Sequence, residues 1–180
     1  MALIIKNRAV VNDDWTVVRA AEDGALPAID ALAAGRVLVP FSLWKAHKDA
    51  LVASRSKDEL GVWLAPDDEP ADLVADFDRI ALVAVDFPVF RDGRGFSIGR
   101  LLRERYRWTG ELRAIGDVLR DQLLFHSRCG FNAFAVREDK DINDALNAFN
   151  EFSEQYQGAT DNLEPLFRRR AAVLAASGAA

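Results

Sequence analysis

The segment Ile80–Asp86 constrains the fold more than any other part of this sequence. Six consecutive apolar residues, Ile80–Val85, precede Asp86 with no polar position among them. A strand that is apolar at every position is typical of a sheet covered on both faces, and such sheets are built from parallel strands joined by helices. The segment therefore predicts an α/β protein with a mostly parallel sheet.

Four other short apolar runs repeat this pattern along the chain. They are Val37–Val39, Gly61–Ala65, Leu112–Ile115 and Ala133–Val136, and a stretch with the apolar spacing of a helix follows each of the five runs. Alternation of strands and helices gives parallel strands with right-handed crossovers. We expect about five sequential βα units, arranged as an open doubly wound sheet or as a part-barrel.

An N-terminal β-hairpin is expected to precede these units. Ala2–Ile5 and Trp15–Arg19 have the composition of short strands, and the polar turn Asn12–Asp14 lies between them. Residues 1–180 are interpreted as a single α/β domain. Its parts are the hairpin and a helix over 1–35, the βα core over 36–158, and a C-terminal helix with a frayed tail over 159–180.

Local signals mark the expected helices. Pro27 suits the first turn of one helix, and Ser42 and Asp117 are the expected N-caps of two others. Residues 97–107 are expected to form a helix. Apolar residues between Ile142 and Tyr156 recur every three or four positions, which predicts one long helix over 142–156.

Length and composition exclude several classes of protein. The 180 residues are 50% hydrophobic and 28% charged, which excludes wholesale disorder. No apolar run reaches the roughly 18 residues of a membrane-spanning helix, and the first residues lack the pattern of a signal peptide. Cys129 is the single cysteine, so no internal disulfide can form, and a cytoplasmic location is expected. The net charge of −5 disfavours nucleic-acid binding.

Positive charge is nevertheless concentrated in one part of the chain. Residues 91–128 contain nine arginines, no lysine and five acidic residues. We interpret this segment as part of a binding site for a small oxyanion or an acidic partner. Arginines that are merely solvated on exposed helix faces are the alternative.

A glycine-rich loop follows the strand that ends at Asp86. Ligands of parallel α/β folds bind beyond the carboxyl ends of strands, and the start of a helix favours anions. We therefore expect Arg91, Arg94, Gly95 and Ser97 to bind an anion. The alternative is a tight turn whose arginines pair with Asp86 and Asp92.

The next strand end repeats this theme with Gly116, Asp117 and Arg120. If the two strands are neighbours, Arg91, Arg94 and Arg120 should converge with Asp86 and Asp117 into what we call the strand-end rim. Asp86 and Asp117 are the candidate acid and base residues. The charged residues after the last strand, Arg137, Glu138 and Asp139, are interpreted as solvated loop charges; the alternative is that they join the rim.

Motifs for cofactors are missing from the sequence. It contains no GxGxxG, phosphate-binding P-loop, GxSxG or CxxC pattern, so no cofactor is expected. His126 and Cys129 fall three residues apart on one expected helix, but two ligands do not make a metal site. Cys129 is expected to be buried, and His47 to be a hydrogen-bonded core residue.

Four segments together resemble an uncharacterised bacterial family. They are Asp86–Ser97, Arg100–Arg105, Gly110–Gln122 and Arg128–Phe134. The family is labelled as an oxidoreductase of sulfite reduction, and its genes lie beside those for assimilatory sulfite or nitrite reductase. The resemblance implies a place in sulfur assimilation and cysteine biosynthesis, with that reductase as a partner. It carries over no catalytic residue.

Three functions are compatible with these observations. The first is an accessory protein of assimilatory sulfite reduction that binds an oxyanion, or the reductase, through the strand-end rim. The second is an enzyme that acts on a small anionic substrate. The third is a non-catalytic scaffold that forms a homo-oligomer through the helix 142–156 or the tail.

Overall fold

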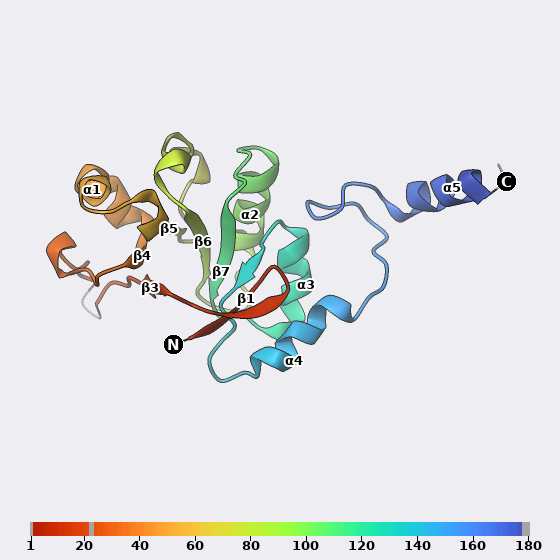
Figure 1. Cartoon of the computed structure of the whole chain (residues 1–180), viewed down its shortest axis with the longest axis horizontal. Coiled ribbons are helices and arrows are strands. Elements are labelled where there is room, and N and C mark those ends of the chain that lie inside the picture. Colours follow the sequence, from red (N-terminus) through yellow and green to blue (C-terminus); the bar gives the residue numbers. More distant parts are fainter. Residues whose placement is uncertain (1, 22–23, 178–180) are drawn as a thin grey trace.

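The computed structural model describes residues 2–21 and 24–177, and its centre is one curled sheet (Figure 1). The sheet has eight strands in the order β2-β1-β8-β7-β6-β5-β4-β3. Their bounds are β1 Leu3–Lys6, β2 Ala9–Asn12, β3 Trp15–Val17, β4 Arg36–Pro40, β5 Leu60–Leu64, β6 Leu82–Phe87, β7 Glu111–Gly116 and β8 Ala133–Phe134.

Strands β3 to β8 follow one another in sequence order, and each is parallel to the next. β1 and β2 complete the sheet as an antiparallel pair beside β8. The predicted fold class is therefore confirmed, and the curled half-barrel corresponds to the part-barrel of the two expected architectures. All five predicted parallel strands are present.

The N-terminal hairpin joins different strands from those expected. β1 pairs with β2 around a tight turn at Asn7 and Arg8, whose φ angles are 50° and 62°. Trp15–Val17 instead forms β3, which pairs in parallel with β4 at the opposite edge of the sheet. The predicted pairing of 2–5 with 15–19 is wrong because the turn at Asn7, a residue type that tolerates positive φ, gives β1 a nearer partner.

The sheet curls because its two edge strands are close neighbours in the chain. β2 and β3 are the edges, yet only Asp13 and Asp14 separate them. Three Cα–Cα steps span at most about 11 Å, so the edges approach each other at this connection. Asp13 also accepts two hydrogen bonds from Nη1 of the buried Arg113 on β7, at 2.9 and 3.0 Å.

Alternate side chains of the strands divide the apolar core into two clusters. One face of the sheet, represented by Val37, Val83 and Ala114, packs with residues of the helices α1 Phe41–Ser54, α2 Arg94–Glu104 and α3 Arg120–Arg128. The other, concave face carries a smaller cluster. It comprises Leu38, Leu82, Ala84 and Ile115, with Trp15, Val17, Trp63 and Ala135 packed against them. The helices thus cover the convex face and leave the concave face for a site.

The helix predicted over 142–156 is wrong. α4 Ile142–Leu146 and a 3-10 turn, η4 Asn147–Asn150, replace it. Asn147 and Asn150 interrupt the pattern because asparagine side chains compete with the helix backbone for hydrogen bonds. Phe152 and Tyr156, which the apolar spacing placed on the same helix face, are 63% and 69% exposed.

Several helix ends also differ from expectation. The helix at Pro27 is only a 3-10 turn, η1 Ile29–Ala31; two further 3-10 segments are η2 Lys57–Glu59 and η3 Pro70–Arg79. Ser42 and Asp117 are not N-caps, because α1 begins at Phe41 and α3 begins at Arg120, after Leu119. Ser97 lies inside α2, which begins three residues earlier than expected.

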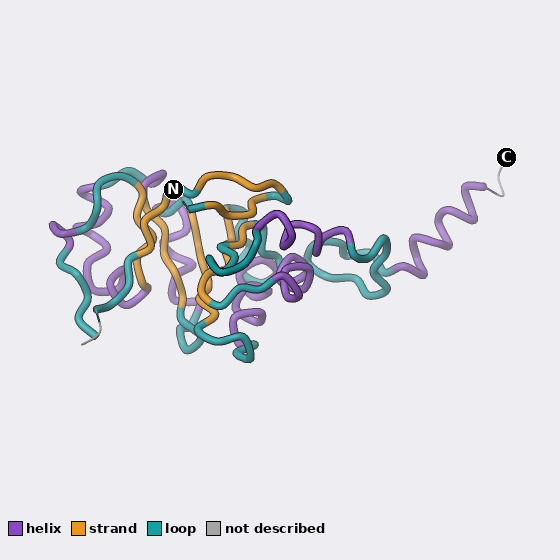
Figure 2. The backbone as a smooth tube through the Cα atoms, turned by 90° about the horizontal axis from the view of Figure 1, so that it is seen from below, coloured by secondary structure: helices purple, strands orange, loops and turns teal. Residues whose placement is uncertain are grey.

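The C-terminal helix α5, Leu166–Ser177, projects away from the body in both views (Figures 1 and 2). A final helix near Pro165 was expected; the frayed end of the tail, 178–180, lies outside the described residues. Within residues 2–21 and 24–177, no helix has the length and apolar content needed to cross a lipid bilayer.

Candidate ligand-binding site

Arg94 of the strand-end rim is held by acidic neighbours. Its Nη2 lies 2.7 Å from Oδ2 of Asp92, and its Nη1 bonds Asp67. The hydrogen bonds from Arg94 lower the pKa of Asp92, and they raise the pKa of the guanidinium in turn. Pairing with Asp92 is the alternative that the sequence left open for this loop.

Arg120 is also engaged, on a different partner set. It bonds Asp144 at 2.7 Å and Glu151 at 2.8 Å, and so ties α3 to the α4 segment. Arg91 is exposed and has no ion pair among the described residues. The pockets at this end of the sheet are lined by other residues, so the structure does not bring the three arginines together around a cavity.

Gly95 and Ser97 have positions that explain their residue types without a ligand. A Cβ on Gly95 would lie 2.6 Å from the ring of Phe87, so glycine allows α2 to approach β6. Ser97 is exposed on α2, beside Arg100 and Leu101. Anion binding by these residues stays a prediction.

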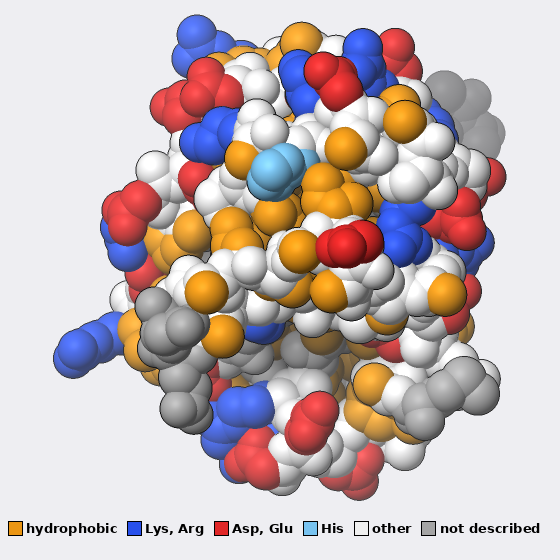
Figure 3. All heavy atoms as spheres, turned by 90° about the vertical axis from the view of Figure 1, so that its left-hand side faces the viewer, with side chains coloured by type: hydrophobic (Ala, Val, Ile, Leu, Met, Phe, Trp, Pro, Cys, Tyr) orange, Lys and Arg blue, Asp and Glu red, His pale blue; other side chains and the backbone are white. Residues whose placement is uncertain are grey.

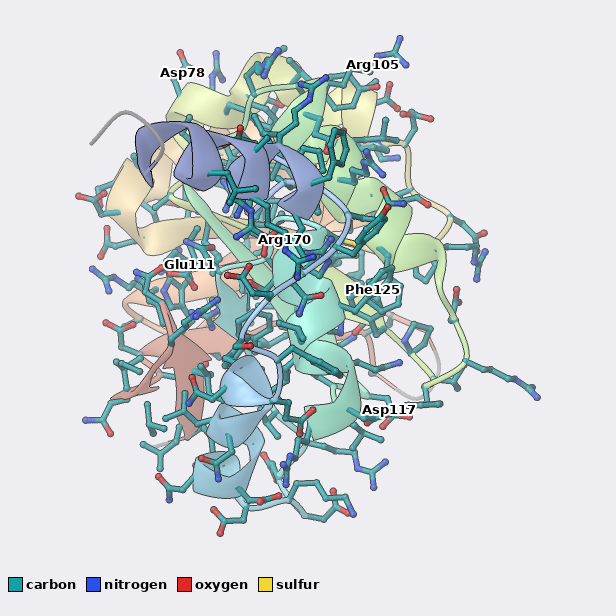
Figure 4. The ribbon with its side chains drawn as sticks, turned by 90° about the vertical axis from the view of Figure 1, so that its right-hand side faces the viewer. Asp78, Arg105, Glu111, Asp117, Phe125 and Arg170 are labelled. Carbon is teal, nitrogen blue, oxygen red and sulfur yellow. The ribbon has the colours of Figure 1, made fainter. Side chains whose placement is uncertain are left out.

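Asp86 and Asp117, in contrast, line one pocket, together with Arg19, Gly116 and Arg137. Asp86 accepts a hydrogen bond from Arg19 at 2.7 Å. Asp117 accepts one from Arg137 at 2.8 Å and one from the backbone N–H of Phe90 at 2.9 Å. Figure 4 shows Asp117 beside the start of α3, with Glu111 at the opposite end of β7. The two candidate carboxylates therefore line the same pocket at the carboxyl ends of β6 and β7.

A larger cavity of about 610 Å³ adjoins this pocket and shares Arg19, Gly116 and Arg137 with it. The cavity lies on the concave face of the sheet. Its apolar lining includes Ile4, Trp15, Val17, Ile115, Ala135 and Ile142, and its charged lining Asp13, Arg19, Arg137, Glu138 and Lys140. We call these two connected hollows the concave site.

Arg19 is oriented by two contacts. Its Nη2 bonds Asp86, and its guanidinium carbon lies 4.8 Å from the ring centroid of Trp63. Trp63 is fixed in turn by a hydrogen bond from its indole N–H to the carbonyl of Val18. Among the described residues, no acceptor bonds Nε or Nη1 of Arg19, so two nitrogens of a positioned guanidinium are available to an anion.

Arg137 has a more saturated set of partners. Its three nitrogens bond Asp117 and both carboxylate oxygens of Asp139, and Lys140 lies 3.2 Å from Asp139. The hydrogen bonds from Arg137 lower the pKa of Asp139. Arg137 is exposed, as expected of a loop charge, and its bond to Asp117 also brings it into the wall of the concave site, as in the alternative that it joins the strand ends.

Gly116 allows the carbonyl of Phe87 and the carboxylate of Asp86 to lie close to the backbone of β7. Its φ is 93°, and a Cβ there would lie 2.4 Å from the carbonyl oxygen of Phe87 and 2.8 Å from Oδ1 of Asp86. Glycine adopts this conformation without the steric cost that other residues carry.

Sequence reasoning missed Arg19. The available signal is a basic residue at the end of an apolar segment. The expected hairpin includes Trp15–Arg19, so the sequence does not indicate that Arg19 follows a parallel strand. The register of β3 with β4 places Arg19 at the carboxyl end of the sheet.

The histidines and the cysteine do not form a metal site. Within the part of the chain that the structure describes, no group of three or more His, Cys, Asp or Glu side chains could hold a metal ion. Cys129 is buried, as predicted, and burial raises the pKa of its thiol to about 11. His47 is not a core residue: it lies exposed beside Ile29 and Leu32, on a face where Figure 3 shows hydrophobic side chains around a histidine. A kink in α1 at His47 (φ −139°) accompanies this position.

Comparisons with known proteins bear on the family. A search of curated proteins and a search of solved structures each found no match. Residues 61–167, more than half of the chain, match the family described as a bacterial protein of unknown function, DUF934, and the match covers the strands from β5 to β8 with the helices between them. The chain therefore belongs to this bacterial family, DUF934.

Proposed function

We propose that this protein is an accessory protein of assimilatory sulfite reduction that binds an anion in the concave site. The pathway is supported by the family resemblance of residues 86–134, which associates such chains with sulfite or nitrite reductase. The single observation that carries the binding role is Arg19, a positioned guanidinium at the mouth of a cavity, two of whose nitrogens have no acceptor among the described residues. Sulfite and sulfate are oxyanions of the kind that a planar guanidinium binds.

Arg19 thus replaces Arg91, Arg94 and Arg120 as the expected anion ligand. Arg94 and Arg120 each already bond two carboxylates, which an anion would have to displace. Arg137 likewise bonds two carboxylates, Asp117 and Asp139, and so positions Asp117. In contrast, no acceptor within residues 2–21 and 24–177 bonds Nε or Nη1 of Arg19.

The binding role is tested by measuring Tm with increasing sulfite, sulfate or phosphate. At 100 times its dissociation constant, a bound anion stabilises the fold by about 2.7 kcal/mol, which is a visible shift in Tm. We expect Arg19→Met to remove the shift. The matched control is Arg100→Met, which removes a surface arginine paired with Glu104 on α2, outside the concave site. A shift that persists in Arg19→Met rejects the assignment.

The pathway is tested separately in cells. Deletion of the gene should prevent growth with sulfate as the sole sulfur source, and added cysteine should restore it. An affinity pull-down from cells grown on sulfate should retain sulfite or nitrite reductase. Normal growth of the deletion strain on sulfate, with no reductase retained, rejects the pathway.

A second function, catalysis on a small anionic substrate, is favoured by one observation. Asp86 and Asp117 line the same pocket from neighbouring strand ends, as an acid and a base would. The test incubates a small-molecule extract of sulfate-grown cells with the protein and follows anion consumption by mass spectrometry. Asp117→Asn should stop consumption while the anion-dependent Tm shift persists.

A further inference from the structure

The concave site is larger than an inorganic oxyanion such as sulfite requires. The main cavity has a volume of about 610 Å³, within the ~300–1,000 Å³ of typical small-molecule sites. A sulfite ion occupies roughly the space of two water molecules, about 60 Å³. An inorganic anion at Arg19 would therefore leave most of the cavity filled with water, and the apolar wall would contribute nothing to its affinity.

The part of the cavity wall that the strands form is apolar. Val17, Ile115 and Ala135 come from β3, β7 and the end of β8, and they belong to the small apolar cluster of the concave face. The aromatic ring of Trp15 lies in the same wall, half-buried. The small side chain of Ala135 leaves this part of the wall shallow enough for a larger residue to fill it. A wall of this kind stabilises an apolar, planar group by removing its surface from water.

Charge is confined to the other parts of the lining. Arg19, Arg137 and Lys140 supply the positive groups, while Asp13 and Glu138 are the negative ones. Asp13 is engaged by the buried Arg113, and so is neutralised within the protein. The cavity thus combines an apolar wall with a charged mouth, where Arg19, Arg137 and Lys140 pair with Asp86, Asp117 and Asp139. In residues 2–21 and 24–177, no acceptor bonds Nε or Nη1 of Arg19, so these donors can reach an anion.

We propose that the concave site binds an organic anion, with a planar apolar body against Trp15 and Ile115 and one sulfonate, phosphate or carboxylate group at Arg19. This inference rests on the proposed anion site and names its ligand class. Binding the anionic group and the apolar body together adds the burial of apolar surface to the charge-assisted hydrogen bonds.

The test compares three probes by isothermal titration calorimetry: 2-naphthalenesulfonate, inorganic sulfate, and the uncharged 2-naphthol. We expect 2-naphthalenesulfonate to bind at least ten times more tightly than either of the other two. Ala135→Leu fills the apolar wall and should weaken 2-naphthalenesulfonate at least tenfold without changing the affinity for sulfate. Arg19→Met should weaken both anions, and Arg100→Met should change neither. Tm values of the variants, measured without ligand, verify that each is folded.

The outcomes separate this inference from the proposed function. If sulfate binds as tightly as 2-naphthalenesulfonate, and Ala135→Leu has no effect, the organic-anion class is wrong and the anion site at Arg19 stands. If 2-naphthol binds as tightly as 2-naphthalenesulfonate and Arg19→Met has no effect, the anion site itself is wrong. Absence of binding by all three probes rejects both, while the pull-down still tests the reductase partner independently.

Discussion

At the scale of single residues, His126 has the most unusual environment in the core. It is fully buried on α3, and among the described residues neither ring nitrogen has a hydrogen-bond partner. The rings of Phe87, Phe96 and Phe131 surround it, with centroid distances of 4.5, 4.6 and 5.2 Å. Burial among these rings lowers the pKa of His126 to about 3, so the imidazole is neutral at physiological pH.

We predict that His126 makes the folded protein sensitive to acid. In the unfolded chain the imidazole takes up a proton near pH 6.5, whereas in the folded protein it does so only near its lowered pKa of about 3. The free energy of unfolding therefore falls as pH decreases through this window, by at most about 1.4 kcal/mol per pH unit. Urea denaturation between about pH 6 and pH 4 should show a shallower slope for His126→Phe than for the wild type. Equal slopes would contradict this prediction.

Gly116 is the residue on which the shape of the concave site depends most directly. We predict that Gly116→Ala lowers the free energy of unfolding by about 1–3 kcal/mol, because it combines a strained φ of 93° with a collision against the carbonyl oxygen of Phe87. Gly35→Ala is the matched control, since Gly35 has a similar φ of 83° and no atom within 4 Å of the added Cβ. If Gly116→Ala lowers the free energy of unfolding by no more than Gly35→Ala does, the backbone at Phe87 moves to accommodate the added Cβ and the prediction is wrong.

At the scale of elements, a buried group of charges holds the curl of the sheet. Arg113 on β7 is 1% exposed and bonds Asp13 at 2.9 Å and Glu111 at 2.7 Å; Glu111 also pairs with Lys6 of β1 at 2.7 Å. These bonds connect the middle of the sheet to β1 and to the link between its two edges.

We predict that Arg113→Met is strongly destabilising. The substitution keeps much of the side-chain volume but leaves two buried carboxylates without their shared cation, which costs about 3–5 kcal/mol. Arg94→Met is the control, because its carboxylate partners Asp67 and Asp92 belong to surface loops and an exposed pair contributes little. Urea denaturation at neutral pH measures both variants, and similar midpoints for the two would refute the role of the buried charges.

The strands were the most predictable elements of this protein. Each buried strand carries its own apolar run, so Leu82–Phe87 and its neighbours could be located without knowledge of the fold. The partner of β1 could not be predicted in the same way, since a turn at Asn7 and Arg8 contains no glycine and has a weak local signal. The apolar spacing of 142–156 was misleading because Phe152 and Tyr156 continue the periodicity beyond the point where the helix ends.

The candidate site was predictable only where it depended on strand ends. Asp86 and Asp117 could be placed together, because Asp86 lies at the end of one parallel strand and Asp117 directly follows its neighbour in the sheet. Of the guanidinium partners, only Asp92, two residues from Arg94, was within reach of the sequence. The others lie far along the chain: Asp67 for Arg94, and Asp144 of α4 for Arg120. Arg19 was missed because its position depends on the register of β3, which no local pattern contains.

At the scale of the whole molecule, the C-terminal segment divides into an anchored part and a projecting part. Thr160 is anchored: its backbone N–H donates to the carbonyl of Arg128, and its hydroxyl bonds Glu104 at 2.9 Å. Beyond it, Leu163 and Phe167 are 80% and 58% exposed, and α5 extends away from the body (Figure 2). A helix of 12 residues is only marginally stable in water by itself, so α5 contributes little to the stability of the sheet.

We therefore predict that removing residues 166–180 leaves Tm within about 2 °C of the full chain, whereas removing residues 158–180 lowers it by about 4 °C or more. The shorter truncation keeps the contacts of Thr160 and the ion pair between Arg128 and Asp161, and the longer one loses both. Loss of Thr160 also uncovers Gly130, whose ideal Cβ position lies 3.1 Å from the Thr160 methyl group. Differential scanning calorimetry of the three chains at equal concentration distinguishes the cases. A large fall in Tm for the shorter truncation would contradict the prediction and mean that α5 packs against protein in solution, either in the same chain or in a second copy. A Tm of the full chain that depends on protein concentration would identify the second copy.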